Sequence, residues 1–540
     1  MARVNILHRL RRALRNRDSS FHPQHQSYQW FVLANIMVGT FMAVLDATIV
    51  NVALPKIMAS FGVSIDKIEW VITGYMLAMA LSLPAAGWLA DKFGYKKIYS
   101  FGLILFTLGS FLCGLANNEN FLIFARVVQG LGGGCLMPIG MAIITREFPP
   151  EKRGMALGFW AVAAAASVSF GPLIGGYLVD NFSWQLIFDV NVPVGIIGII
   201  VTIIILREYK SKAVRKFDII GFVSASIFFP VTLYALSEST AASNSEGWSA
   251  PYILFCFAIA AVSLAVFITT ELIVEDPLID LRLFKDHNFA MSNITLFIFG
   301  IGMFGSTFLL PLYLQNSLGY TALQSGAVFL PIGFIQGAVS PLIGAVSDKW
   351  GYKTPLIIGV LLLAISFYIN GFLSYLTEHD YIMLSLYIRG VGLGMIFTPL
   401  SAVSLLEIPR AKMGQASGLF NIVRQLGGSF GVALLATILS SRVSYHAQVY
   451  GESIQLNSQA LRNAVVNMNY YEEKSAGSAP VKAQTQSRAM ILMDVNKQAF
   501  IQGVDDDFLI AGLITIVGGI PILFLHSKKK RDSIRAISNE

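Results

Sequence analysis

The chain has 540 residues, of which 55% are hydrophobic and only 13% charged, and its net charge is +7. A soluble domain carries about a quarter charged residues, and so much apolar surface would make a soluble protein of this size aggregate. The composition therefore excludes an ordinary cytosolic enzyme, a secreted disulfide scaffold and a disordered chain. The three cysteines lie in apolar runs without a C-x-x-C pair, so the sequence indicates neither a metal site nor a disulfide framework.

Fourteen apolar runs follow one another along the chain, each long enough for a membrane-spanning helix of about 20 residues. They lie near 29–54, 68–89, 98–117, 121–145, 154–179, 186–206, 218–237, 250–271, 288–315, 322–345, 354–375, 380–404, 413–440 and 506–526. Because the runs are continuous rather than alternating, they predict an all-α polytopic membrane protein and not a barrel. The first run follows a basic arm without a small-residue cleavage site, which indicates a retained helix rather than a signal peptide.

The basic residues gather on one side of the predicted membrane. Of the 39 lysines and arginines, 28 fall in alternate gaps between the runs, a set that includes both ends of the chain. Such an excess marks the cytoplasmic side, so we expect a multi-pass membrane protein with both termini in the cytoplasm. Orientation then accounts for the basic charge, and no nucleic-acid partner is needed.

The chain contains an internal repeat that predicts two homologous halves. The pattern Pro84-x-x-Gly87-x-x-x-Asp91-Lys92-x-Gly94-Tyr95-Lys96 recurs 257 residues later, from Pro341 to Lys353. Membrane transporters often have duplicated halves with a substrate site between them. The predicted divisions are a basic arm 1–28, a six-helix bundle 29–206, two inserted helices with linkers 207–287, a second six-helix bundle 288–526 and a basic tail 527–540.

The gap 441–505 is the one sizeable segment expected outside the membrane, on the external face. It is polar, and 486–503 has the apolar spacing of an amphipathic helix. Two interpretations stay open: a solvated continuation of the two flanking helices, or a docking surface for an external partner.

Several motifs resemble the major facilitator superfamily, and within it the 14-span EmrB/QacA-type drug:proton antiporters. The segment 45–55, LDATIVNVALP, resembles the signature of that group, and 87–97 resembles the superfamily's loop 2–3 motif. Leu122-x-x-x-Arg126-x-x-Gln129-Gly130 resembles the motif associated with proton coupling. The segments 276–289 and 424–428 are also similar to EmrB-like exporters. The resemblance implies a major facilitator fold of two six-helix halves with two further helices between them.

The resemblance also covers Gly171-Pro172-x-x-Gly175-Gly176, which is similar to the antiporter motif. Two positions depart from the pattern: Ser167 replaces a glycine, and Asp189 stands where such exporters are mostly apolar or aromatic. Since proline removes a backbone donor, Gly171 and Pro172 are expected to bend their helix. Gly175 and Gly176 are expected to allow close contact with a neighbouring helix.

Few charges lie inside the apolar runs, and these are the candidates for proton coupling. Asp46 lies deep enough for ionisation to be costly, so it can bind either a proton or a cationic compound; alternatively it bonds locally to Thr48 or Asn51. Arg126 needs a buried partner and serves either coupling or a structural bridge. Asp189 is either a second protonation site or a solvated helix start. Arg389 and Arg424 are either functional or anchors for packing.

The repeated motif predicts a cytoplasmic latch between the halves. A carboxylate there can accept hydrogen bonds from a helix N-terminus, and the helix beginning near Met413 is the expected partner of Asp91. The latch comprises Gly87, Asp91, Gly94, Lys96, Asp348 and Gly351. The alternative for the lysines is plain positive-inside topology.

An adaptable apolar cavity is expected to take the substrate. Its candidate lining residues are Phe41, Met42, Tyr75, Gln129, Phe304 and Phe308. No nucleotide-binding loop, metal cluster or nucleophile–base pair is present in the sequence, so we expect no enzyme activity and no cofactor, with a proton gradient as the energy source.

The leading hypothesis is a proton-coupled exporter of amphipathic, often cationic drugs that works by alternating access. The alternatives are a dedicated exporter of an endogenous solute, such as a lipid, siderophore or metabolite, and a non-transporting membrane sensor. The resemblance to EmrB-like exporters further implies a location in the inner, cytoplasmic membrane of a bacterium. In a double-membraned bacterium it also implies a periplasmic adaptor and an outer-membrane channel as partners, with the segment 441–505 as the docking surface.

Overall fold

The computed structural model describes residues 27–63, 68, 70–149, 152–209, 216–239, 244, 246–409, 412–453, 466–467 and 480–526. Every regular element in these ranges is a helix, as the continuous apolar runs predict. The basic arm (apart from its last two residues) and the basic tail lie outside the described residues.

The first group of helices comes from the N-terminal part of the chain. Its members are α2 (Tyr28–Phe61), α4 (Trp70–Phe93), α5 (Tyr95–Gly114), α6 (Glu119–Glu147), α7 (Arg153–Asn181), α8 (Leu186–Asp189) and α9 (Asn191–Ile205). Within this group α6 packs on α4 and α5, α2 packs on α7, and α9 packs on α5 and α2. Helix α6 is therefore central, and it carries Arg126 and Gln129.

The second group comes from the C-terminal part. Its members are α12 (His287–Asn316), α13 (Ala322–Ala327), α14 (Leu330–Trp350), α15 (Lys353–Ile369), α16 (His379–Ser404), α17 (Met413–Ser453), α19 (Pro480–Gly519) and the 3-10 turn η5 (Ile520–Phe524). Helix α16 packs on α14 and α15, and α12 packs on α17 and α19. The two groups meet along α7 with α14 and along α4 with α17.

Helix caps fix several of the helix starts. Asn118 accepts a hydrogen bond from the Phe121 N–H at 2.9 Å, and Asp286 accepts one from the Phe289 N–H at 2.8 Å. These side chains satisfy backbone donors that a helix start otherwise leaves unpaired.

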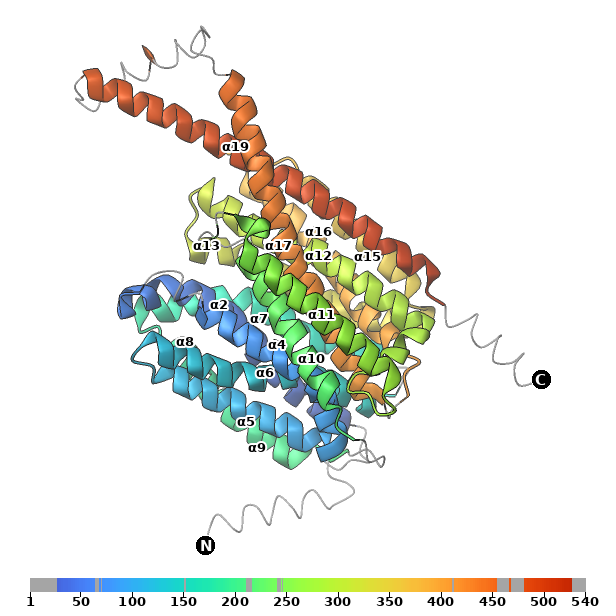
Figure 1. The fold of residues 1–540 in the computed structure, drawn as a ribbon. Coiled ribbons are helices and arrows are strands. Elements are labelled where there is room, and N and C mark those ends of the chain that lie inside the picture. The colour runs from blue at the N-terminus through green and yellow to red at the C-terminus, as the bar shows by residue number, and fades with distance from the viewer. Residues whose placement is uncertain are drawn as a thin grey trace.

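The inserted pair consists of α10 (Ile219–Glu238) and α11 (Pro251–Ile273), with the 3-10 turn η2 (Gly247–Ser249) between them and η3 (Leu281–Lys285) after α11. Helix α10 packs on both α4 and α17, so the pair lies across the seam between the two groups (Figure 1). The linker after α11 is tied to the start of α17. There the Gln415 amide donates to the Pro277 and Leu278 carbonyls, at 3.0 and 3.1 Å, and Lys412 pairs with Asp280 at 2.5 Å.

The number of membrane spans is close to the predicted fourteen. In the described ranges, twelve helices are long and apolar enough to cross a membrane. The other two predicted runs, 154–179 and 354–375, coincide with α7, of 29 residues, and α15, of 17 residues. All fourteen runs are therefore helical, and the count of fourteen spans stays a prediction.

The repeat places equivalent turns at one end of the molecule, which we call the latch end. Gly94 follows α4 with φ +109°, and Gly351 follows α14 with φ +102°. Residues with a side chain rarely adopt this backbone conformation, which explains why glycine stands at both positions. The opposite end is called the arm end, because two helices project from it.

The arm consists of the outer parts of α17 and α19, residues 441–453 and 480–505. Helices of 41 and 40 residues are about 60 Å long, twice the thickness of a bilayer core. Figure 1 shows both extending past the rest of the molecule. The prediction that this segment continues its flanking helices is confirmed for these residues, and the helix expected over 486–503 lies within α19.

Candidate functional site

Asp46 lies at the centre of a buried polar cluster formed by five helices. Its Oδ2 pairs with the Arg126 Nη1, while its Oδ1 accepts hydrogen bonds from the Gln129 Nε2 at 2.8 Å and the Asn191 Nδ2 at 3.2 Å. The carboxylate of α2 thus receives donors from α6 and α9. Asp46 has no solvent exposure, so these partners replace the hydration that burial removes.

Arg126 is held on every side by α6 and its neighbours. Its Nε donates to the Val71 carbonyl of α4 at 3.0 Å, and its Nη1 also donates to the Gln129 Oε1 at 2.6 Å. The guanidinium lies 4.1 Å from the centre of the Tyr75 ring. A planar group with several fixed donors suits these partners, and lysine offers only a point charge in its place.

Gln129 connects this ion pair to α5. Its Nε2 donates to the Ser110 Oγ at 2.7 Å as well as to Asp46. The backbone approach is close: a Cβ at Gly109 would lie 2.6 Å from the Gln129 Cα. The cluster therefore depends on tight packing of α5 against α6, which the glycines of both helices allow.

The structure assigns the contribution of the α8–α9 segment to Asn191 rather than to Asp189. The Asp189 side chain lies against the end of α5, where a Cβ at Gly114 would be 2.0 Å from its Oδ1. Among the described residues it makes no side-chain hydrogen bond to the cluster, so Asp189 lies apart from Asp46, and its role as a second protonation site stays a prediction. An amide at Asn191 was not singled out from the sequence, because its distance from Asp46 in the chain hides the contact.

The other two intramembrane arginines occupy different settings. The Arg389 Nε donates to the Ser366 Oγ at 3.3 Å, and its guanidinium lies over the rings of Phe367 and Phe508, inside the second group of helices. Arg424 lies between the groups, since its Nη2 is 3.4 Å from the Met137 Sδ of α6. Neither contacts a carboxylate among the described residues.

One half of the predicted latch joins α14 to the start of α7. The Asp348 carboxylate accepts hydrogen bonds from the Gly154 and Met155 N–H groups, at 3.2 and 3.3 Å. A Cβ at Gly344 would lie 2.3 Å from the Gly154 carbonyl oxygen, so the two backbones touch. The negative charge stands at the positive end of the α7 dipole, which favours this contact.

The other half joins α4 to α17 in a related way. A Cβ at Gly87 would lie 2.8 Å from the Gly414 carbonyl oxygen, at the start of α17. Asp91 accepts a hydrogen bond from the Tyr95 hydroxyl at 2.8 Å, and the Arg146 Nη2 is 3.5 Å from the same carboxylate oxygen. Sequence reasoning placed the contact near Met413 but missed Tyr95 and Arg146.

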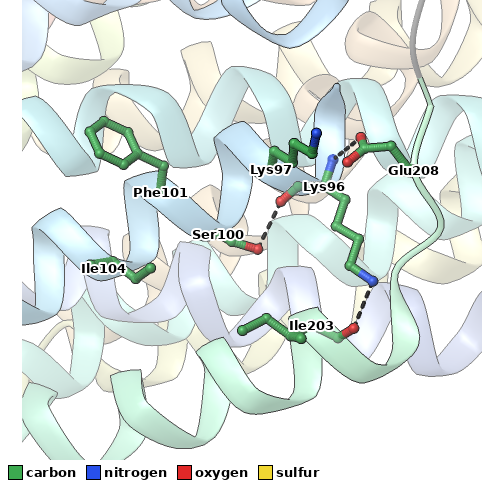
Figure 2. Close-up of a pocket in the computed structure, with 7 residues that line it drawn as sticks. All are labelled: Lys96, Lys97, Ser100, Phe101, Ile104, Ile203 and Glu208. Carbon is green, nitrogen blue, oxygen red and sulfur yellow. Dashed lines mark hydrogen bonds between the residues drawn. The ribbon is translucent and has the colours of Figure 1, made fainter. Parts of the chain in front are cut away.

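Lys96 is not part of this contact between the groups. Figure 2 shows it on a shallow pocket of about 570 Å³ between α5 and α9, where its Nζ donates to the Ile203 carbonyl at 2.6 Å. Its backbone N–H donates to the Glu208 carboxylate at 3.2 Å. Lys96 therefore caps the end of α9 within one group, and the expectation that it belongs to the latch is corrected.

The antiporter motif packs α7 against α2 beside Asp46. A Cβ at Gly171 would be 2.1 Å from the Thr48 Oγ1, and one at Gly175 would be 2.8 Å from the Ile49 Cγ1. A Cβ at Gly176 would be 3.1 Å from the Leu323 Cδ1 of α13. Helix α7 is continuous through Pro172, whose side chain lies outside the described residues.

The residues proposed to line a substrate cavity lie in different surroundings. Tyr75 and Gln129 are buried against Arg126 and belong to the polar cluster. Met42 is buried, and the Phe304 ring packs on Gly428, 3.1 Å from where a Cβ would be. Phe41 is partly exposed, and the Phe308 side chain lies outside the described residues.

Two bundles of long apolar helices with a buried charge cluster define a polytopic membrane transporter. A profile of the Major Facilitator Superfamily matches residues 36–432. The chain belongs to the major facilitator superfamily, as its motifs predict.

Its relatives place it with the EmrB-type members of that family. The multidrug export protein EmrB of Escherichia coli is 31% identical over 448 residues, which cover 82% of this chain and 87% of EmrB. The uncharacterized MFS-type transporter YhcA of Bacillus subtilis is 32% identical over 517 residues, covering 94% and 95%. The homologues are transport and export proteins and not enzymes.

Solved structures agree on the fold. The human organic anion transporter MFSD10 superimposes with a TM-score of 0.60 at 12% identity, covering 92% of this chain and 99% of MFSD10. The proton:xylose symporter XylE gives 0.59 at 13% identity, covering 93% and 96%.

Removing one partner of the buried ion pair should destabilise the protein more than removing both. Asp46→Asn or Arg126→Gln leaves an uncompensated buried charge, which costs about 3–5 kcal/mol. The double variant should be more stable than the sum of the single effects predicts, by about 0.5–3 kcal/mol. Thermal unfolding of the purified variants measures this, and strict additivity would contradict the pairing.

A side chain at Gly344 should open the latch end. Gly344→Val places atoms against the Gly154 backbone, so α7 and α14 must separate. Distances between spin labels on the two groups should then shift toward longer values at that end. Gly198→Val is the matched control, because the nearest atoms to its Cβ position are 4.0 Å away. Equal distance distributions in Gly344→Val and the parent protein would exclude the latch.

Proposed function

We propose that this transporter exports amphipathic, cationic compounds across the inner membrane in exchange for protons. The observation that carries the proposal is the fully buried Asp46, paired with Arg126 and bonded to Gln129 and Asn191. Intramembrane ionisable residues are costly and tend to mark substrate or proton pathways. The names of the EmrB relatives support multidrug export as the type of transport.

The chemistry follows from what Asp46 can bind. As a carboxylate it is held by the guanidinium and two amides; on taking a proton it loses its charge and with it most of the attraction to Arg126. A cationic substrate near the carboxylate disfavours that proton, because both neutralise the same charge. Proton and substrate therefore compete, which is the requirement for exchange.

Movement of the two groups of helices against each other would open Asp46 to one side of the membrane at a time, so that the proton and the substrate can enter and leave on opposite sides. In this structure the latch end is closed by Asp348 on α7 and by the contact of Gly87 with Gly414. Opening these contacts while the arm end closes would alternate the exposure of Asp46. Binding energy shifts this equilibrium only as far as each ligand prefers one state.

The partners and orientation are part of the same proposal. The 28 basic residues in alternate gaps favour a cytoplasmic latch end and cytoplasmic termini. The projecting arm then lies outside the membrane, where an adaptor that leads to an outer-membrane channel has a surface to bind. The ligands are small-molecule drugs and protons, and the proton gradient replaces a cofactor.

Export into inverted membrane vesicles tests the proposal. With an inward-acid proton gradient, the protein should accumulate a fluorescent lipophilic cation, and Asp46→Asn should lower accumulation to the level of vesicles without the protein. Asp380→Asn is the matched control, since Asp380 is exposed at the start of α16. Full gradient-driven export by a folded Asp46→Asn variant would overturn the role of Asp46, and accumulation of one metabolite alone would identify a dedicated exporter.

A further inference from the structure

Three consecutive acids, Asp505 to Asp507, lie in α19 where the arm enters the predicted membrane, and each has different surroundings. Asp505 accepts a hydrogen bond from the Leu373 N–H at 2.9 Å, in the connection between α15 and α16. Asp506 binds the Arg442 Nε at 2.6 Å and the His446 Nε2 at 2.7 Å, both on α17. Neither oxygen of Asp507 has a hydrogen-bond partner among the described residues.

Asp507 is also the most deeply buried of the three. Its side chain has 0% exposure, while Asp506 is 26% exposed and its partner Arg442 is 40% exposed. Its helical neighbours Val504, Phe508 and Ala511 are buried apolar residues. An ionised carboxylate in such a place, with no donor to replace its hydration, is strongly unfavourable.

We propose that Asp507 is a second proton-binding site of the transporter, which exchanges its proton with the external water through the Asp506–His446 pair. In the state described here Asp507 holds the proton as a neutral carboxyl group. Asp506, the preceding residue in the chain, and His446 are partly exposed, so we take them as the route from the buried carboxyl group to water. The inference deepens the proposed proton coupling and shares its assumption that protons are the driving ligand.

In the part of the chain that the structure describes, few charged and titratable groups surround the three acids. They are Asp505 and Asp506 on α19, Arg442 and His446 on α17, Tyr313 on α12 and Tyr381 on α16. Within the described ranges of this group, Arg442 carries the fixed positive charge, and it binds the neighbouring Asp506. When Asp507 releases its proton, the new carboxylate stands beside that of Asp506 and competes for Arg442.

This competition gives the site a mechanical consequence. Arg442 and His446 join α17 to α19 through Asp506 at the base of the arm. An arginine has five N–H donors, so it can turn part of its fork from Asp506 toward an ionised Asp507. Proton exchange at Asp507 is therefore coupled to the contact between the two arm helices.

Infrared difference spectroscopy of the full chain in lipid nanodiscs tests the proposal without transport. The parent protein at neutral pH should show the carbonyl-stretch band of a protonated carboxyl group, and this band should be lost in Asp507→Asn. Asp494→Asn, at an exposed position of the arm, is the matched control and should keep the band. At high pH the parent protein should lose the band as well.

The outcomes separate this inference from the proposed function. A parent-minus-Asp507→Asn difference spectrum without a carbonyl band would overturn the second site even if export through Asp46 is intact. If the carbonyl band of Asp507 is present but the vesicles show no gradient-driven export, the proposed function is overturned and the proton-binding site at Asp507 stands. Should Asp507→Asn fail to fold, Asp507→Glu retains a carboxyl group, and its band must shift in frequency; an unshifted band would likewise overturn the assignment.

Discussion

A buried ion pair in a low-dielectric bundle is the constraint on which the rest of this structure depends. Asp46 and Arg126 have almost no contact with solvent, so each must find its partners within the protein. Five helices meet to supply them: the Val71 carbonyl, the Gln129 and Asn191 amides and, one step further, the Ser110 hydroxyl. Packing and charge are thus satisfied by the same set of contacts.

Close helix approach is what makes this arrangement geometrically feasible. The Gly109 backbone lies directly on Gln129, and Gly171 lies on Thr48 two residues from Asp46. At the latch end, contacts between glycine backbones join the two groups, with Asp348 at the start of α7. The site and the interface between the two groups therefore share α7, which packs on α2 on one side and on α14 on the other. Asp46 on α2 is thus connected to the latch through the packing of α2 on α7 and of α7 on α14.

The sequence predicted the features that follow from local patterns or from strict spacing. All fourteen apolar runs are helices, and the repeat identified equivalent turns at Gly94 and Gly351. Asp46 and Arg126 were found because isolated charges are conspicuous in apolar runs. Contacts between distant segments were less accessible: Asn191 rather than Asp189 reaches Asp46, and Lys96 caps α9 and does not join the latch. Asp507 was not singled out, because the sequence does not show which of the three adjacent acids at the start of the run 506–526 is fully buried.

If proton and substrate compete for Asp46, substrate binding must release a proton, and this release can be measured. The purified protein in weakly buffered detergent solution is mixed with a lipophilic cation while a pH indicator reports released protons. We expect release near the pH at which Asp46 is protonated, and no release from Asp46→Asn at equal binding. Substrate binding without proton release at every pH, or undiminished release from Asp46→Asn, would contradict it.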